Sequence, residues 1–447
     1  MGITSFTFVL YILLFASIFY FQNKTLRKAT LLIASILFYL SFSTIGFLYL
    51  VFISVFTYYI SKNINKSSFI LGLLVLVLGL IVLKVNFFYL NDEFISFIGV
   101  SFFSFKAIGY LIDVYNNKIK VVDSFFDYFI YISFFPTITA GPIQKAQDFM
   151  VDLDNIGKDI PYEDLKTGFL LLCLGIFEKV VIVERISILI DYIMETQASL
   201  DIMILLLILF SYKIYLDFDS YSNIAIGCSK MFGFNVKANF KSPYLSKNLR
   251  QFWRRWHISL STFFKDYVYI PLGGNKKGKM IQYINVLIVS ILSGLWHGIN
   301  LGCFIWGLLH GLGQIVFDKA DSFFKDSLIK TIISTVLTFS FVSFVWLFFL
   351  GNSFEYFNYF IDSVKLGFSS GLNIPNINFP DIKATLILLV IMIVLDYFRY
   401  KYNVLEYFNK LNIVIRWIFY IALIFTFLLL GTYGSTYNAS DFIYWQF

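Results

Sequence analysis

Charged side chains are scarce in this chain of 447 residues. They make up 14% of it, whereas hydrophobic residues make up 58%. Soluble domains carry about 25% and about 45–50% respectively. One membrane-spanning helix needs about 20 mostly apolar residues, so eleven of them would use roughly half of the chain. The composition therefore excludes an ordinary soluble globular protein, and it excludes a disordered or collagen-like one as well.

Cysteine and histidine are also rare, with three of each. Cys173, Cys228 and Cys303 are widely spaced in apolar stretches. This spacing excludes a disulfide framework or a cysteine-based metal site, and we interpret the three as small core residues. The chain also lacks a phosphate-binding glycine loop, a nucleophile elbow and zinc-ligand spacing. We therefore expect no metal, no resident cofactor and no nucleic-acid partner.

Long uncharged stretches predict an all-α, polytopic integral membrane protein with ten to twelve transmembrane helices. The stretch from Met280 to Phe317 has 38 residues without Asp, Glu, Lys or Arg. That is room for two passes, or for one pass and a re-entrant segment. The other predicted spans are Ile3–Phe21, two between Ala29 and Ile60, Ser68–Leu90, Phe94–Ile112, Phe125–Ala140, Gly168–Val183, Ile202–Tyr215, Ile332–Leu350, Ala384–Leu395 and Ile413–Leu430.

Basic residues set the expected orientation. Lys24, Arg27 and Lys28 follow the first apolar segment, whereas a cleaved signal peptide would carry its charges before that segment. The positive-inside rule places these residues in the cytoplasm, so we expect an extracytoplasmic N-terminus.

Proline is rare too, yet two of the seven prolines interrupt one apolar run. Pro136 and Pro142, together with Gly141, fall inside or beside the predicted span that ends at Ala140. Non-helical backbone at membrane depth persists only where protein or a water-filled cavity surrounds it. We therefore expect re-entrant and interfacial helices around a central cavity rather than a plain bundle.

The formal net charge of +7 is concentrated in one segment. Lys237–Lys279 holds ten Lys or Arg and one acid, Asp266, so it carries +9 and leaves −2 for the rest of the chain. By the positive-inside rule this basic segment faces the cytoplasm.

Helical spacing predicts a single helix in the middle of the basic segment, with one polar face. That face would hold Arg250, Arg254, His257, Ser261 and Lys265. Two interpretations remain open. The first is an interfacial amphipathic helix that is anchored by aromatic residues and attracted to anionic lipid. The second is a cytoplasmic entrance that attracts an anionic donor, such as a coenzyme A thioester or an acidic carrier protein.

His297 is the most conspicuous of the three histidines, because it lies in the long uncharged stretch. An ionisable residue at membrane depth is costly to bury and is by default a candidate functional residue. Imidazole can take a proton from a hydroxyl group and return it, which suits acyl transfer. We interpret His310 instead as a structural residue that makes a helix–helix hydrogen bond.

Two further polar pairs have structural interpretations. Asp217 and Asp219 have the spacing of an acidic metal-binding pair of the glycosyltransferase kind, but no acid cluster follows them. Polar contacts inside a helix bundle, or at its edge, are the better interpretation. Lys106 and Asp113 are seven residues apart on one helical face and could form an intramembrane ion pair that fixes helix packing.

At its two histidine blocks the sequence resembles the membrane-bound O-acyltransferase (MBOAT) family. The resemblance is closest to the bacterial branch of alginate and peptidoglycan O-acetyltransferase membrane subunits. The first block runs from Gln251 to Asn275 and contains Arg-Arg-Trp-His257, and the second contains Trp-His297-Gly followed by His310-Gly. Three more segments are similar: Ser101–Phe105, Ala140–Ile143 and Tyr221–Gly227, although Asn223 stands where Asp is expected.

The resemblance covers essentially the whole chain and implies one MBOAT domain. We expect N-terminal spans over residues 1–124, a catalytic core over 125–320 and C-terminal spans over 321–447. His297 corresponds to the family's invariant histidine, and His257 to its second polar position. The implied donor-binding residues are Arg250, Trp253, Arg254, Arg255 and Trp256, with Asp266, Trp296 and His310 in support.

The aromatic C-terminal hexapeptide, Phe442–Phe447, also resembles this branch, in which a tyrosine has been proposed as an acyl relay. Tyr444 could therefore accept the acyl group, or it could anchor the chain at the membrane interface. Both roles remain open.

In family terms the protein would be an enzyme of the bacterial cytoplasmic membrane. It would take an acyl group, expected to be acetyl, from a cytoplasmic thioester such as acetyl-CoA and pass it across the membrane. A separate extracytoplasmic esterase-like (SGNH) transferase would then O-acetylate a cell-surface polysaccharide. One alternative is a teichoic acid D-alanyl transfer protein that uses a carrier-protein donor. Another is a polysaccharide flippase or transporter, although the internal repeats expected of many transporters are missing.

Overall fold

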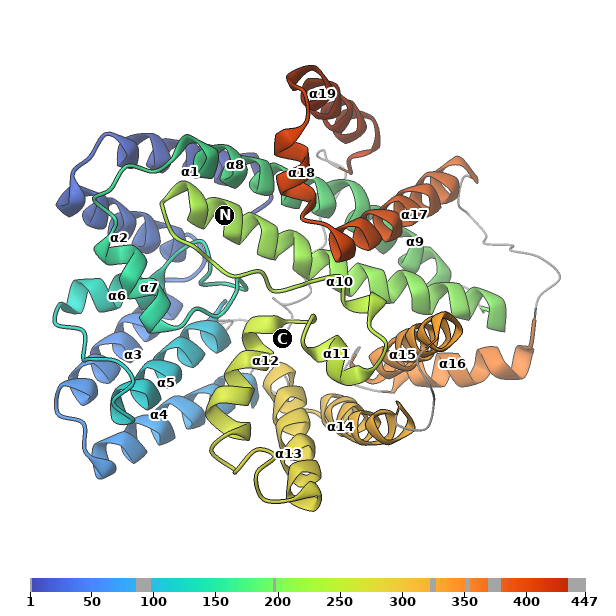
Figure 1. Cartoon of the computed structure of the whole chain (residues 1–447), viewed down its shortest axis with the longest axis horizontal. Helices are drawn as coiled ribbons and strands as arrows, with labels where there is room; N and C mark the ends of the chain where they lie inside the picture. The colour runs from blue at the N-terminus through green and yellow to red at the C-terminus, as the bar shows by residue number, and fades with distance from the viewer. Residues whose placement is uncertain are drawn as a thin grey trace.

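The computed structural model describes residues 2–85, 98–195, 198–321, 327–349, 354–368 and 379–432, and every regular element in these ranges is a helix. The predicted all-α class is thus confirmed (Figure 1). The helices are α1 (Phe6–Tyr20), α2 (Lys24–Leu40), α3 (Thr44–Lys62), α4 (Lys66–Val85), α5 (Val100–Tyr115), α6 (Phe125–Ser133), α7 (Ala146–Asp154), α8 (Tyr162–Phe177), η3 (Glu178–Val183), α9 (Glu184–Met194), α10 (Leu200–Met231), η4 (Pro243–Leu245), α11 (Leu249–Trp253), α12 (Ile258–Phe264), η5 (Lys265–Tyr269), α13 (Lys279–His297), α14 (Leu301–Asp321), α15 (Leu328–Phe349), α16 (Glu355–Leu366), α17 (Phe379–Lys401), α18 (Val404–Lys410) and α19 (Ile413–Leu430).

Among the described residues, five helices are long and apolar enough to cross a membrane, namely α3, α4, α13, α15 and α19. The helix α1 and the Leu301–Phe317 part of α14 are apolar but shorter. These helices are those of a multi-pass membrane protein. The total of ten to twelve spans stays a prediction.

The span predicted over Phe125–Ala140 is wrong. The helix α6 has 9 residues and ends at Ser133, whereas a span needs about 20. Pro136 cannot donate a backbone hydrogen bond, and the chain leaves the helix just before it. Every residue from Phe134 to Pro142 is buried. Protein therefore surrounds this irregular segment, as expected for non-helical backbone at membrane depth.

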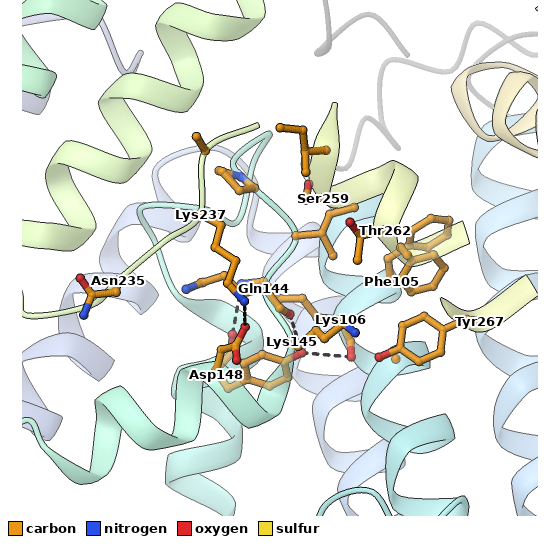
Figure 2. Close-up of a pocket in the computed structure, with 17 residues that line it drawn as sticks. Phe105, Lys106, Gln144, Lys145, Asp148, Asn235, Lys237, Ser259, Thr262 and Tyr267 are labelled. Atoms are coloured by element: carbon orange, nitrogen blue, oxygen red, sulfur yellow. Dashed lines mark hydrogen bonds and ion pairs between the residues drawn. The ribbon is translucent and has the colours of Figure 1, made fainter. Parts of the chain in front are cut away.

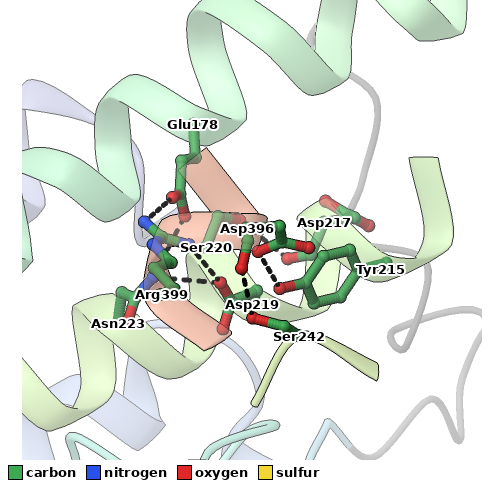
Figure 3. Close-up of polar contacts among 9 residues, drawn as sticks. All are labelled: Glu178, Tyr215, Asp217, Asp219, Ser220, Asn223, Ser242, Asp396 and Arg399. Carbon is green, nitrogen blue, oxygen red and sulfur yellow. Dashed lines mark hydrogen bonds and ion pairs between the residues drawn. The ribbon is translucent and has the colours of Figure 1, made fainter. Parts of the chain in front are cut away.

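The helix α10 is longer than predicted, with 32 residues, and it carries Asp217 and Asp219 in its interior. Asp217 Oδ1 lies 2.8 Å from Lys179 Nζ. Asp219 Oδ2 lies 3.2 Å from the guanidinium of Arg399 on α17, which also contacts Glu178 at 2.7 Å (Figure 3). The interpretation of these acids as polar contacts inside the bundle is confirmed. In the part of the chain described here, no group of acids, histidines and cysteines could hold a metal ion.

The ion pair between Lys106 and Asp113 does not form. Lys106 Nζ donates hydrogen bonds to Tyr131 O at 3.2 Å and to Thr137 Oγ1 at 3.1 Å, while Asp113 accepts one from Tyr267 Oη at 2.6 Å. Seven residues correspond to about 10.5 Å along a helix axis, which is too far for two side chains on one helix to meet easily.

The cysteines occupy two kinds of apolar surroundings. Cys228 and Cys303 are buried, as interpreted, whereas Cys173 is exposed on α8. An apolar stretch indicates a protein core or a lipid-facing surface equally well, because neither is in contact with water. Only the tertiary packing assigns Cys173 to the exterior.

The single helix predicted through the basic segment is wrong, because it is broken at His257. The helix α11 ends at Trp253, and α12 begins at Ile258. His257 has φ +40°, in the left-handed region that a continuous right-handed helix does not contain, and it directly precedes α12. The two short helices consequently carry their side chains on different faces.

The uncharged stretch from Met280 to Phe317 forms two neighbouring helices, α13 and α14. Both expected arrangements, two passes or one pass and a re-entrant segment, stay predictions. Glycines bring their backbones into contact. A Cβ atom on Gly294 would lie 2.2 Å from Cys303 O, and one on Gly307 would lie 2.4 Å from Ser290 O. This close approach fixes the end of α13, where His297 is the last residue.

Candidate active site

His297 is held at the C-terminal end of α13 by aromatic rings. Its side chain is 2% exposed, and its ring centroid lies 4.7 Å from that of Trp296, 5.4 Å from Trp306 and 5.1 Å from Phe349. All three rings are steeply inclined to the imidazole, with interplanar angles of 75°, 82° and 74°. These contacts hold the plane of the imidazole in one orientation.

His257 is fully buried at the break between α11 and α12. Asn239 fixes the backbone on its C-terminal side, because Asn239 O accepts from Ile258 N at 2.9 Å and Asn239 Oδ1 accepts from Ser259 N at 3.0 Å. A left-handed conformation is uncommon for a non-glycine residue and persists where the surroundings determine it. The break aims the imidazole at the centre of the fold, 4.7 Å from Phe218.

Trp296 contacts both histidines. Its ring centroid is 5.9 Å from that of His257 and 4.7 Å from that of His297. Phe105 of α5 packs against the same indole at 5.4 Å. His257 and His297, which are 40 positions apart in the sequence, are thereby brought into one compact group. We call these two residues the histidine pair.

His310 lies one step further from the histidine pair, in an aromatic pocket. It is fully buried, and its ring centroid lies 4.7 Å from Trp306 and 5.0 Å from Trp253. Neither imidazole nitrogen has a hydrogen-bond partner among the described residues. The predicted helix–helix hydrogen bond is therefore wrong in this part of the chain, because the surrounding side chains are aromatic rings without acceptors at that point.

A cavity of about 800 Å³ lies beside α13 and begins among cationic side chains. Its polar mouth is lined by Arg250, Arg254, Lys265 and Lys276. From there its lining follows successive turns of α13: Gln282, Tyr283, Val286, Val289, Ser290 and Ser293. Ser293 is four residues, or about one helical turn, before His297. We call this the α13 cavity.

The other three predicted donor-binding residues, Trp253, Arg255 and Trp256, lie in three different surroundings. Trp253 lines the α13 cavity. The Arg255 guanidinium instead lies 4.3 Å from the ring centroid of Tyr400 on α17. Trp256 is buried in the aromatic core, 5.2 Å from Trp346. The end of α11 at Trp253 is consistent with the division, because Arg255 and Trp256 lie in the turn that follows this helix.

A second, smaller cavity of about 90 Å³ lies on the other side of α12 (Figure 2). Lys106 and Gln144 line its interior, and Tyr267 closes one side. Asp266, predicted as a supporting residue, lies near this cavity and pairs with Lys145 at 2.5 Å. The remaining predicted site residue, Tyr444, lies outside the described residues.

Lys84, which belongs to none of the sequence motifs, lies beside the histidine pair. Its Nζ donates to His297 O at 3.4 Å and lies 5.7 Å from the ring centroid of Trp296. The signal was present, because Lys84 is a charged residue near the end of a long apolar segment. Its partner, however, is 213 residues away.

Comparison with known proteins shows sequence similarity to one family and to several curated proteins. Residues 114–361 match the membrane-bound O-acyltransferase (MBOAT) family. The chain is 31% identical over 387 residues to a peptidoglycan O-acetyltransferase of Helicobacter pylori, covering 75% of this chain and 73% of that protein. It is 31% identical over 327 residues to a protein named probable alginate O-acetylase in Pseudomonas fluorescens, with coverage of 70% and 64%. A teichoic acid D-alanyltransferase of Bacillus subtilis is 31% identical over 280 residues, with coverage of 59% and 70%.

Because the family match covers more than half of the sequence, this chain belongs to the MBOAT family. It is a multi-pass membrane O-acyltransferase, and the expected resemblance is confirmed. The matched region contains His257, His297 and His310. The names of the relatives differ in both the acyl group and the acceptor.

Proposed function

We propose that this protein takes an acetyl group from a cytoplasmic thioester, acetyl-CoA, and passes it across the membrane for O-acetylation of a cell-surface polysaccharide. The observation that carries the proposal is the α13 cavity, which joins a cationic mouth to the turn before His297. The names of the Helicobacter pylori and Pseudomonas fluorescens relatives support acetyl as the acyl group.

The mouth of the cavity suits a donor that carries phosphate groups. Arg250 and Arg254 present guanidinium groups, and Lys265 and Lys276 add two further cations. Charge-assisted hydrogen bonds from guanidinium to phosphate are among the stronger polar contacts in proteins. Beyond the mouth, Val286 and Val289 provide an apolar wall along which a thioester arm can extend.

The length of α13 separates the donor side from the acceptor side. This helix has 19 residues and runs from Lys279 to His297, a rise of about 27 Å. The apolar core of a bilayer is about 30 Å thick. With the basic segment in the cytoplasm, His297 lies toward the far end of the helix, where an acceptor can approach from outside.

In the proposed reaction His297 acts as general base. It takes the proton of an acceptor hydroxyl, whose oxygen attacks the thioester carbon. When the C–S bond breaks, the leaving sulfur takes the proton from the imidazole. His257, which also contacts Trp296, orients the donor or stabilises developing charge. Tyr444 is the proposed first acceptor, and a separate extracytoplasmic transferase of the Ser-His-Asp esterase kind is the proposed partner.

The decisive experiment replaces His297 in cells and measures ester-linked acetyl groups on wall and capsule polymers by mass spectrometry. His297→Ala should lower the acetyl content at least about 100-fold relative to wild type, because general base catalysis commonly supplies 10²–10⁴-fold. The amount of variant protein in the membrane is the control. Normal acetylation at a normal protein level would refute the proposal.

A second candidate is D-alanyl transfer from an acidic carrier protein, favoured by the Bacillus subtilis relative and by the +9 charge of the basic segment. Purified protein offered acetyl-CoA and a D-alanyl carrier protein in parallel decides between them by the thioester that it consumes. The flippase or transporter is set aside, because the chain belongs to a family of O-acyltransferases.

A further inference from the structure

Lys84 is a buried cation beside the histidine pair. It lies on the candidate span α4 and is 7% exposed. A charged residue at membrane depth costs several kcal/mol to bury and is by default a candidate functional residue. Neighbouring groups must therefore stabilise the positive charge of Lys84.

No carboxylate in the described ranges lies within ion-pair distance of Lys84, whereas Lys179, which is also buried, is paired with two. Lys179 has Glu184 at 3.1 Å and Asp217 at 2.8 Å. Lys106 has no acid either, but two oxygen acceptors, at 3.2 and 3.1 Å. Lys84 has one acceptor in the described ranges, His297 O at a long 3.4 Å. An ammonium group carries three N–H donors, so the described structure leaves capacity on Lys84 for a further oxygen.

Two features hold the ammonium group in place. Trp296 presents its ring 5.7 Å from Nζ, which is within the range of a cation–π contact. The carbonyl of His297 is at the C-terminal end of α13, where the helix dipole favours a positive charge. Both contacts are with the adjacent residues Trp296 and His297. They therefore hold the ammonium group at a constant position relative to the proposed general base.

We propose that Lys84 is a catalytic residue, whose ammonium group binds the carbonyl oxygen of the acyl donor while that oxygen gains negative charge. The inference rests on the proposed role of His297. As the acceptor oxygen bonds to the thioester carbon, the carbonyl electron pair moves onto the oxygen and the hydroxyl proton passes to His297. The pair then returns, the C–S bond breaks and the sulfur takes the proton.

The physical reason is electrostatic. A fixed donor aimed at an oxygen that becomes charged is worth most in a dry site, because no water competes and nothing has to reorganise. Aromatic rings surround this site on the His297 side. A lysine held there serves the transition state more than the uncharged ground state.

The experiment measures steady-state kinetics of acetyl-CoA consumption by the purified full-length protein in detergent. Lys84→Met removes the charge but keeps the length of the side chain. It should lower kcat about 100- to 1,000-fold, with KM for acetyl-CoA within about threefold. Lys84→Arg keeps the charge and should retain kcat within about tenfold of wild type.

The matched control is Lys106→Met, which removes a buried lysine from the neighbouring helix α5 and should keep kcat within about threefold. A kcat for Lys84→Met close to wild type, a change confined to KM, or equal losses in Lys84→Met and Lys106→Met would each overturn the inference. If Lys84→Met fails to fold, Lys84→Gln is measured in the same assay, and the same changes in kcat and KM are expected.

His297→Ala separates this inference from the proposed function. If His297→Ala is inactive while Lys84→Met is active, the proposed function stands and the role of Lys84 falls. If His297→Ala is active, the proposed function itself falls, whatever Lys84→Met does.

Discussion

His257 shows how a single residue can shape the site through its backbone as well as its side chain. Its φ of +40° lies immediately before α12, and its imidazole packs against Trp296. Periodicity alone could not reveal this break, because residues 250–265 have the spacing of one continuous helix. The break depends on Asn239, which accepts hydrogen bonds from the two residues after His257.

The arginines of the basic segment differ in what they contact: Arg250 and Arg254 line the α13 cavity, whereas Arg255 lies against Tyr400. Kinetic measurements on single variants can reveal this difference. Arg250→Ala and Arg254→Ala should each raise KM for acetyl-CoA at least about tenfold with little change in kcat. Each removes a charge-assisted contact worth about 1.5–3 kcal/mol from the mouth of the α13 cavity. Steady-state kinetics at low and high salt provide the test, and the effect should shrink at high salt.

Arg255→Ala is the matched control for these two variants. Its guanidinium lies against Tyr400 and not in the α13 cavity, so KM should stay near the wild-type value. An equal rise in KM for Arg255→Ala would contradict the assignment of the cavity to the donor.

At the scale of elements, the close packing of α13 and α14 places His297. Gly294 lets α13 approach the carbonyl of Cys303, only one turn before the histidine. Sequence analysis predicted room for two passes but not this contact, because a glycine in an apolar helix has many possible reasons. The geometry of the packed pair supplies the reason.

Gly294→Ala should therefore destabilise the protein by about 1–3 kcal/mol and reduce activity, because the added methyl group would lie 2.2 Å from backbone that cannot rotate away. Thermal unfolding and acetyl-CoA consumption are the measurements. The control is Gly72→Ala, where the nearest atom is Leu111 Cδ1 at 3.0 Å. That side chain can move, so the control should behave like wild type. Equal losses in both variants would contradict the argument.

At the scale of the whole molecule, one face gathers the basic residues from both halves of the chain. Arg27 donates to the carbonyl oxygens of Ile156 and Lys158. Lys237, the first residue of the basic segment, pairs with Asp148 of α7 at 2.6 Å. The first basic cluster, α7 and the basic segment thus share one side. From the positive-inside rule we propose that this side faces the cytoplasm.

This orientation can be tested with single cysteines introduced into a Cys173→Ala background. A membrane-impermeant maleimide applied to intact cells should label Gly2→Cys and not Asn155→Cys, since the two lie at opposite ends of α1. Permeabilised cells should show labelling of both and serve as the control. The reverse pattern in intact cells would place the basic segment outside and contradict a cytoplasmic donor.

The sequence by itself determined the membrane class, the helical architecture, the basic segment and the two histidine blocks. The first three follow from hydrophobicity and charge counted along the chain, because backbone in lipid must pair within its own helix. The histidine blocks were recognised by their resemblance to the MBOAT family. The tertiary structure alone decided that α6 stops short, that the helix breaks at His257, which arginines line the α13 cavity, and that Lys84 meets His297. Such contacts join residues far apart in the chain, 213 positions in the last case. They depend on how helices pack, which local periodicity does not encode.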